Sequence, residues 1–160
     1  SVNERLLDFL RSYERDDTEI LFITGKKSYA DLNNNLIVPK STKIVPFFEN
    51  LPSLMKSADL IISRAGASTK TPSILIPSPY VANNHQYYNA LDLVNKKISI
   101  LIEEKDLDKN TLIKAIDEIF DENTLKEIKS NLKEIKDVAS STLIVNNIKA
   151  ILKEKNAKKD

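Results

Sequence analysis

Residues 58–77 read ADLIISRAGASTKTPSILIP and hold two short apolar runs separated by a polar turn. The runs at 60–63 and 73–77 are rich in isoleucine and leucine, which is typical of strands buried on both faces of a parallel sheet. Gly66 comes just after the first run, and it is one of only two glycines in the chain. A scarce glycine after a strand indicates a place where the backbone turns sharply or approaches a ligand closely. This stretch predicts strand, turn and strand within an α/β fold.

Apolar runs and helical patterns alternate along the rest of the chain. Further strands are expected at 19–24, 43–47 and 98–102. Helices are expected at 2–13, 29–36, 51–57 and 84–96 and from Leu107 onward, the last with breaks near 121–124 and 140–141. Asn50 and Asn84 are the expected N-caps of the third and fourth helices. The alternation predicts a Rossmann-like, three-layer α/β domain whose parallel sheet is covered on both faces.

The connection between the strands at 60–63 and 73–77 does not fit this fold easily. Parallel neighbours need a crossover of about a dozen residues, usually including a helix. Only residues 64–72 lie between these two strands. Two alternatives follow: the connection is unusual, or residues that belong after Thr69 are missing from the chain.

Composition limits the class of protein further. The chain has 160 residues, a formal net charge of +1 and no cysteine. These values predict one domain at 1–150 with a lysine-rich tail at 151–160, no disulfide, and no nucleic-acid partner. Because no apolar run approaches the roughly 20 residues of a membrane span, a soluble chain is expected. The tail is interpreted as a solvated helix end or, alternatively, as weakly attracted to an anionic membrane surface.

Two segments are similar to the C-terminal domain of glycosyltransferase family 28. Residues 64–69 (RAGAST) follow a strand, as the family's Arg-(Ser/Ala)-Gly-Ala-x-Thr turn does. Residues 83–90 (NNHQYYNA) resemble the family's polar loop, Asn/Asp-x-x-Gln-x-x-Asn-Ala. Residues 47–52 resemble the loop that contacts uracil in the family. The similarity runs from about residue 1 to about residue 150 and implies the C-terminal, nucleotide-sugar-binding half of a GT-B glycosyltransferase.

The chain departs from the family pattern in two places. The family's helix after Thr69, with its ribose-binding glutamate, is absent, at the point where the crossover is short. The family's first strand and its loop Gly-Gly-Ser-x-Gly-Ala, which holds the diphosphate, would lie before Ser1. The acceptor-binding N-terminal domain is absent as well. The resemblance therefore implies a fragment of the enzyme rather than a natural deletion.

The turn at 64–69 is the first candidate binding segment. A helix N-terminus after Gly66 would offer unpaired amides to a phosphate, although a tight turn alone would also explain the glycine. Ser68 and Thr69 are good helix caps. The resemblance implies that Ala67, Ser68 and Thr69 surround the diphosphate and the sugar. Arg64 has two interpretations, balancing the diphosphate charge or forming a structural ion pair.

The loop at 83–90 is the second candidate segment. Gln86 and Asn89 lie three residues apart and share one face of a helix, and amides both donate to and accept from hydroxyls. The resemblance implies that they bind the hydroxyls of N-acetylglucosamine; surface polarity or capping is the alternative. His85 is the only histidine. Because the family often has glutamine there, we interpret it as a donor-sugar contact and not as the general base.

Three further interpretations concern aromatic and acidic residues. Phe48 is expected to pack on or near the uracil or, alternatively, to be an ordinary buried aromatic. Tyr87 and Tyr88 are expected to pack against the sheet. Glu103 and Glu104 are expected to be solvated.

The resemblance implies an inverting transfer of N-acetylglucosamine from UDP-N-acetylglucosamine to lipid I, which forms lipid II in peptidoglycan synthesis. It implies no metal and no cofactor, and it places the base and the lipid acceptor site in the absent domain. The parent enzyme would associate peripherally with the cytoplasmic face of the bacterial plasma membrane. The chain alone is expected to bind the donor weakly and to be inactive. Two alternatives remain open: a related diacylglycerol glycosyltransferase, and a non-catalytic subunit that binds a nucleotide sugar.

Overall fold

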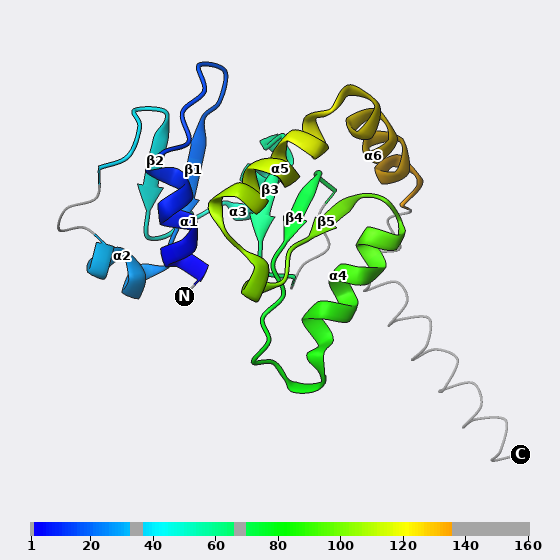
Figure 1. Ribbon diagram of the computed structural model, residues 1–160, viewed down its shortest axis with the longest axis horizontal. Coiled ribbons are helices and arrows are strands. Elements are labelled where there is room, and N and C mark those ends of the chain that lie inside the picture. Colours follow the sequence, from blue (N-terminus) through cyan, green and yellow to red (C-terminus); the bar gives the residue numbers. More distant parts are fainter. Residues whose placement is uncertain (1, 33–36, 66–69, 136–160) are drawn as a thin grey trace, which may run out of the picture.

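The computed structural model describes residues 2–32, 37–65 and 70–135, in which helices and parallel strands alternate (Figure 1). The elements are α1 (Val2–Leu10), β1 (Ile20–Ile23), α2 (Lys26–Leu32), β2 (Thr42–Val45), α3 (Leu51–Ser57), β3 (Ile61–Ser63), β4 (Ser73–Leu75), α4 (His85–Asn95), β5 (Ser99–Leu101), α5 (Lys109–Phe120) and α6 (Glu122–Glu134). Short 3₁₀ turns, η1 (Ala82–Asn84) and η2 (Glu104–Asp106), precede α4 and α5. The predicted α/β class is confirmed.

The strands pair in parallel throughout, but in two separate groups. β1 pairs with β2, and β4 lies between β3 and β5. Within the described residues no ladder joins β1 to β3. The single sheet expected from the sequence is thus divided into a two-stranded and a three-stranded part, and Figure 1 shows α1 beside the first and α5 beside the second.

The short connection between β3 and β4 does close a parallel pair. Ile61 lies opposite Ser73, Ile62 opposite Ile74 and Ser63 opposite Leu75. A three-residue strand is only about 10 Å long, whereas the nine residues from 64 to 72 can span about 30 Å when extended. The nine residues are therefore long enough to reach the start of β4, and both alternatives for this connection remain, because residues 66–69 lie outside the described residues.

The three-stranded sheet is covered on both faces. Ile74 and Ile76 point to the face covered by α5, where they join one large core cluster. Leu75 points the other way and packs against Ala90 of α4 in a second cluster, and both residues have 0% exposure. This alternation is the period-two pattern of a strand between two helical layers. The predicted Rossmann-like three-layer arrangement is therefore present in this part of the molecule.

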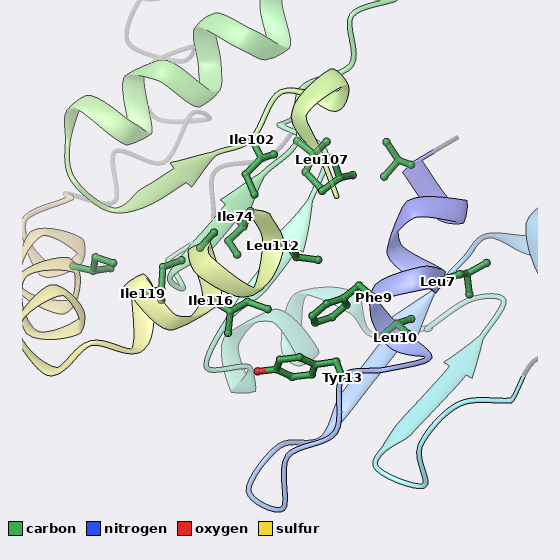
Figure 2. Packing of buried hydrophobic residues seen from close by; sticks show 14 residues of the cluster. Leu7, Phe9, Leu10, Tyr13, Ile74, Ile102, Leu107, Leu112, Ile116 and Ile119 are labelled. Carbon is green, nitrogen blue, oxygen red and sulfur yellow. The ribbon is translucent and has the colours of Figure 1, made fainter. Parts of the chain in front are cut away.

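Helix α1 joins the two-stranded part to the rest. Its apolar residues Leu7, Phe9 and Leu10, together with Tyr13, belong to the same cluster as α5, and Figure 2 shows Phe9 and Tyr13 beside Ile116 of that helix. Burying each large apolar side chain contributes about 1.5–3 kcal/mol. The Arg5 guanidinium also donates to the carbonyl of Leu107 at 2.8 Å. These contacts place both groups of strands around one core.

Local details confirm one expected cap and correct other expectations. Asn50 caps α3, since its side chain accepts from the Ser53 amide at 3.2 Å. Helix α2 begins at Lys26, earlier than predicted, because Gly25 adopts a φ of +81° and its carbonyl accepts from the Tyr29 amide. Asn84 occupies the cap position of α4 without a side-chain bond, because its φ of 53° is left-handed rather than extended. The residues expected at the end of the second helix, 33–36, lie outside the described residues.

Candidate functional site

The carboxyl ends of β3, β4 and β5 meet at one edge of the sheet, which is where ligands bind in open parallel sheets. Arg64 follows β3 at this edge, and His85, Gln86 and Asn89 lie in the first turns of α4, after the loop that leaves β4. Phe48 follows β2 in the two-stranded part. Gly66, Ala67, Ser68 and Thr69 lie outside the described residues. Five of the nine predicted site residues can therefore be located, four of them on the three-stranded sheet.

The Arg64 side chain connects the carboxyl ends of β3, β4 and β5 through hydrogen bonds and an ion pair. Its Nη1 donates to the carboxylate of Glu104 at 2.7 Å and to the carbonyl of Pro77 at 3.3 Å, with the carbonyl of Ile76 at 3.5 Å. These acceptors follow or extend β4 and β5, whereas Arg64 itself follows β3. The ion pair of one interpretation is thus present, and the balancing of diphosphate charge by Arg64 stays a prediction.

Glu104 at this edge departs from the prediction made from the sequence. It was expected to be solvated, but only 18% of its side chain is exposed, against 40% for its partner Arg64. Glu103 does match the expectation, because its side chain is 42% exposed and pairs with the likewise exposed Lys105. The signal available in the sequence was an acidic residue just after one strand and an arginine just after another, since the carboxyl ends of parallel strands share an edge.

A tight turn sets the start of α4. Asn83 and Asn84 have φ values of 54° and 53°, a left-handed conformation that asparagine tolerates better than most residues. At the other end of the same loop, the Ser78 amide donates to Oε1 of Gln86 at 2.8 Å. The loop from 78 to 86 is thus closed by its own side chain, which fixes where the first turn of α4 lies.

The orientation of His85 follows from one contact. Its Nδ1 lies 2.9 Å from the carbonyl oxygen of Ala82. A carbonyl can only accept, so Nδ1 carries the hydrogen and Nε2 of the neutral ring is left as an acceptor. The side chain is exposed, so this acceptor faces solvent or a ligand. A hydroxyl group is the kind of donor that it suits.

Gln86 and Asn89 complete the polar start of α4. Because Oε1 of Gln86 is used by Ser78, its amide nitrogen is the part available to a ligand, and it can only donate. Asn89 is exposed, and no hydrogen bond of its side chain occurs within the described residues. Histidine, glutamine and asparagine therefore present an acceptor, a donor and a group that does both. This is a suitable set for the hydroxyls of a sugar.

The predictions for the aromatic residues Phe48 and Tyr88 have different outcomes. Phe48 keeps 36% of its surface exposed, so it is not a fully buried core residue, and its ring is accessible. Tyr88 was expected to pack against the sheet, but it is 63% exposed and meets Tyr87 edge-on with ring centroids 5.9 Å apart. The expectation for Tyr88 was wrong because α4 buries the face that carries Ala90, and the position of Tyr88 in the helix points away from that face.

Acidic residues do not gather into a metal site in the part of the chain that the structure describes. The sequence has one Asp-x-Asp, residues 106–108. The Asp108 carboxylate accepts from the Thr111 amide at 2.8 Å and caps α5. Its role is therefore structural. Separately, none of the helices in the described ranges combines the length and apolar character needed to cross a bilayer.

Comparison with known protein families gives one match over most of the chain. Residues 2–143 match the glycosyltransferase family 28 C-terminal domain. The chain is 37% identical over 145 residues to UDP-N-acetylglucosamine–N-acetylmuramyl-(pentapeptide) pyrophosphoryl-undecaprenol N-acetylglucosamine transferase 1 of Bacillus cereus, covering 84% of this chain and 40% of that protein. It is 39% identical over 123 residues to the transferase of the same name from Exiguobacterium sibiricum, covering 72% and 34%. The chain thus spans about 40% of the length of the first of these relatives.

Solved structures with the same fold are also glycosyltransferases. The crystal structure of Acinetobacter baumannii MurG superposes with a TM-score of 0.71 at 23% identity, covering 93% of this chain and 45% of that one. The glycosyltransferase VinC, solved in complex with dTDP, gives a TM-score of 0.63 at 15% identity, covering 89% and 37%. At these identities the likeness establishes the fold, that of the C-terminal Rossmann-like domain of GT-B enzymes.

Proposed function

The chain belongs to glycosyltransferase family 28 as its C-terminal domain, and from this premise we propose that it is the donor-binding half of an inverting N-acetylglucosaminyltransferase. The donor is UDP-N-acetylglucosamine, and the acceptor is the lipid-linked peptidoglycan precursor lipid I, which becomes lipid II. Both follow the names of the relatives that are 37–39% identical to this chain. The lipid acceptor and the general base would belong to the N-terminal domain of the longer relatives.

The polar start of α4 carries the proposal. His85, Gln86 and Asn89 lie at the carboxyl-end edge of the sheet and offer hydrogen-bonding atoms that the described residues leave unused. Sugar hydroxyls donate and accept, and the three side chains together do the same. The exposed Phe48 ring, after β2, is assigned to the uracil face.

Chemistry at such a site is a displacement. The acceptor hydroxyl attacks the anomeric carbon, the bond from that carbon to the UDP oxygen breaks, and negative charge develops on the diphosphate. N–H and O–H donors stabilise that charge most strongly when the protein holds them in place before the reaction begins. We assign this role to the segment of Gly66, Ala67, Ser68 and Thr69, whose placement lies outside the described residues. Arg64 holds the carboxyl ends of the strands in position through its bonds to the Glu104 carboxylate and to the Pro77 carbonyl that follows β4.

The divided sheet supports a further part of the proposal. In the doubly wound strand order 3-2-1-4-5-6, the first strand lies between the second and the fourth. Here β2 and β1 match places 3 and 2, and β3, β4 and β5 match places 4 to 6. We propose that a strand and glycine-rich loop, which precede α1 in the longer enzyme, fill the place between β1 and β3. A helix following Thr69 would supply the ribose contact.

The proposed enzyme acts at the cytoplasmic face of the bacterial plasma membrane through peripheral association. The membrane contacts would come from the N-terminal domain and the lipid acceptor. The lysine-rich residues 151–160 could add a weak attraction to anionic lipid, but they lie outside the described residues.

Calorimetric titration of the chain tests donor binding. We expect UDP-N-acetylglucosamine to bind more tightly than UDP-glucose or UDP-galactose, which would be preferred by a diacylglycerol glycosyltransferase. Gln86→Ala and Asn89→Ala should each weaken donor binding by about tenfold, because each removes a hydrogen bond worth about 1.4 kcal/mol. Asn95→Ala, at the other end of α4, makes the same change on an exposed residue and should have no effect.

Two results would contradict the proposal. Equal losses for Asn89→Ala and Asn95→Ala would remove the sugar site from α4. Measurable transfer to lipid acceptor by this chain alone would place the catalytic machinery within it. A natural chain of this length that binds donor but joins another protein would instead favour a non-catalytic subunit.

A further inference from the structure

A hollow lies at the opposite edge of the three-stranded sheet from the candidate site. It has a volume of about 340 Å³ and is lined by residues that precede β3 and β4 and by side chains of α3, the end of α5, and α6. The amino ends of parallel strands meet at the edge opposite their carboxyl ends. The hollow is thus separate from Arg64 and the start of α4, and nothing in the proposed glycosyl transfer uses it.

The floor of the hollow is apolar. Phe120, Leu125 and Leu132 line it, together with Pro72. Phe120 is 44% exposed at the last position of α5, although the residue before it, Ile119, is completely buried. The free energy falls when a large exposed aromatic and the partly exposed leucines beside it are covered by another apolar group and removed from water. An apolar side chain of a partner would find a complementary place there.

Lysines surround this floor. Lys56 comes from α3, and Lys129 and Lys133 lie four residues apart on the same face of α6. Within the described ranges none of these three makes an ion pair or hydrogen bond, whereas lysines elsewhere do, as Lys97 does with Glu127 at 2.7 Å. The lining includes one carboxylate, that of Asp59. The hollow therefore carries positive charge that the described part of the chain does not balance.

We propose that this hollow docks an acidic peptide segment of a partner protein, with one apolar side chain on the Phe120–Leu132 floor and carboxylates against the lysines. The concave floor favours a peptide over a bilayer, because a flat lipid surface would meet the lysines without filling the hollow. Nucleic acid fits less well, since the chain has a formal net charge of only +1. Lysine ammonium groups are compact point charges that pair with carboxylates without a fixed planar geometry.

The experiment is an NMR titration of the ¹⁵N-labelled chain with a designed probe. The probe is a twelve-residue peptide with a central leucine–phenylalanine pair flanked by glutamates; a second peptide has glutamines in place of the glutamates. We expect shifts confined to residues 56–59, 70–72 and 120–133, and binding that weakens several-fold between 50 and 200 mM salt, because salt screens exposed charges. The glutamine peptide should bind at least about tenfold more weakly.

Charge reversal gives the matched control. Lys129→Glu should weaken probe binding by about tenfold or more, whereas Lys126→Glu, the same change on an exposed residue of α6 that does not line the hollow, should have little effect. Circular dichroism of both variants checks that α6 is intact. Equal losses for the two variants, or no shifts at 1 mM probe, would overturn the proposal. Lys129-dependent co-sedimentation with phosphatidylglycerol vesicles, without peptide binding, would overturn it in favour of a lipid surface.

Discussion

A pair of buried hydroxyl groups gives a quantitative test of how the three-stranded sheet is held together. Ser73 and Ser99 open β4 and β5, lie opposite each other in the register, and have Oγ atoms 2.7 Å apart. Ser73 has 0% exposure, whereas Ser99 keeps 7%. Within the described residues each hydroxyl finds its hydrogen bond in the other.

Replacing one of the two serines should lower the free energy of unfolding more than replacing both. Ser99→Ala leaves the fully buried Ser73 hydroxyl without a partner and should lower the free energy of unfolding by about 2–3 kcal/mol. Ser73→Ala should cost less, about 1–2 kcal/mol, because the slightly exposed Ser99 can turn toward water. The double variant should lie within about 1 kcal/mol of the original chain, since two small apolar groups then face each other. The coupling energy would thus be at least about 2 kcal/mol.

Urea unfolding followed by far-ultraviolet circular dichroism measures all four chains. The dependence of free energy on urea should be the same for each, so that the midpoints report stability alone. Losses that simply add in the double variant would refute the reasoning, because they would mean that each serine acts independently. A smaller loss for Ser99→Ala than for Ser73→Ala would contradict the assigned burial.

The remaining predictions concern the edge of the sheet, the core and the helix caps. Glu104→Gln should weaken UDP binding several-fold in calorimetry, because it breaks the 2.7 Å ion pair with Arg64 and so loosens the strand ends. Glu103→Gln, whose carboxylate pairs with Lys105, should leave UDP binding unchanged. Tighter UDP binding by Glu104→Gln would instead show that the released Arg64 contacts the diphosphate. Ile119→Ala should cost about 2–5 kcal/mol in urea unfolding, against less than about 1 kcal/mol for its exposed neighbour Phe120→Ala; equal losses would contradict the assigned core. The pKa of Asp108 and of Asp121 is lowered from 3.8, chiefly by the backbone N–H groups of Thr111 and Thr124. Because the folded-state pKa lies below the usual value, this stabilisation is present above about pH 4 and is lost as the pH falls through the folded-state pKa. Thermal unfolding of Asp108→Asn and Asp121→Asn from pH 6 to pH 2 should show a smaller acid loss than the original chain, and identical pH profiles would contradict this.

The fold was predictable because its signals are local. Apolar runs such as 60–63 and 73–77 are too short for helices, and their composition alone places them in a buried parallel sheet. The cap at Asn50 was predictable for the same reason, since a side chain and an amide three residues away decide it. The left-handed Asn84 was not, because its conformation depends on the whole loop from 78 to 86, which Gln86 closes.

The candidate site was predictable only in part. Residue type and spacing favoured His85, Gln86 and Asn89 as a polar group, and the structure places all three in the first turns of α4. Local spacing does not identify the partner of Arg64, because Glu104 is forty positions away along the chain. The pair follows only from placing both residues after parallel strands whose carboxyl ends share an edge. The separation of β1 from β3 was equally invisible, since strand order is a property of the assembled sheet.

The contact between α1 and α5 has a consequence for how the chain is made. Arg5 of α1 and Leu107, two residues before α5, are joined by a hydrogen bond although they are 102 positions apart. At a synthesis rate of 5–20 residues per second, about 5 to 20 seconds pass between their appearance at the ribosome. During that time Leu7, Phe9 and Leu10 have no helix α5 to cover them. A nascent chain therefore exposes the apolar face of the amphipathic helix α1 to its surroundings. Truncated chains that end before α5 are expected to be bound by chaperones or degraded by proteases rather than to accumulate as stable species.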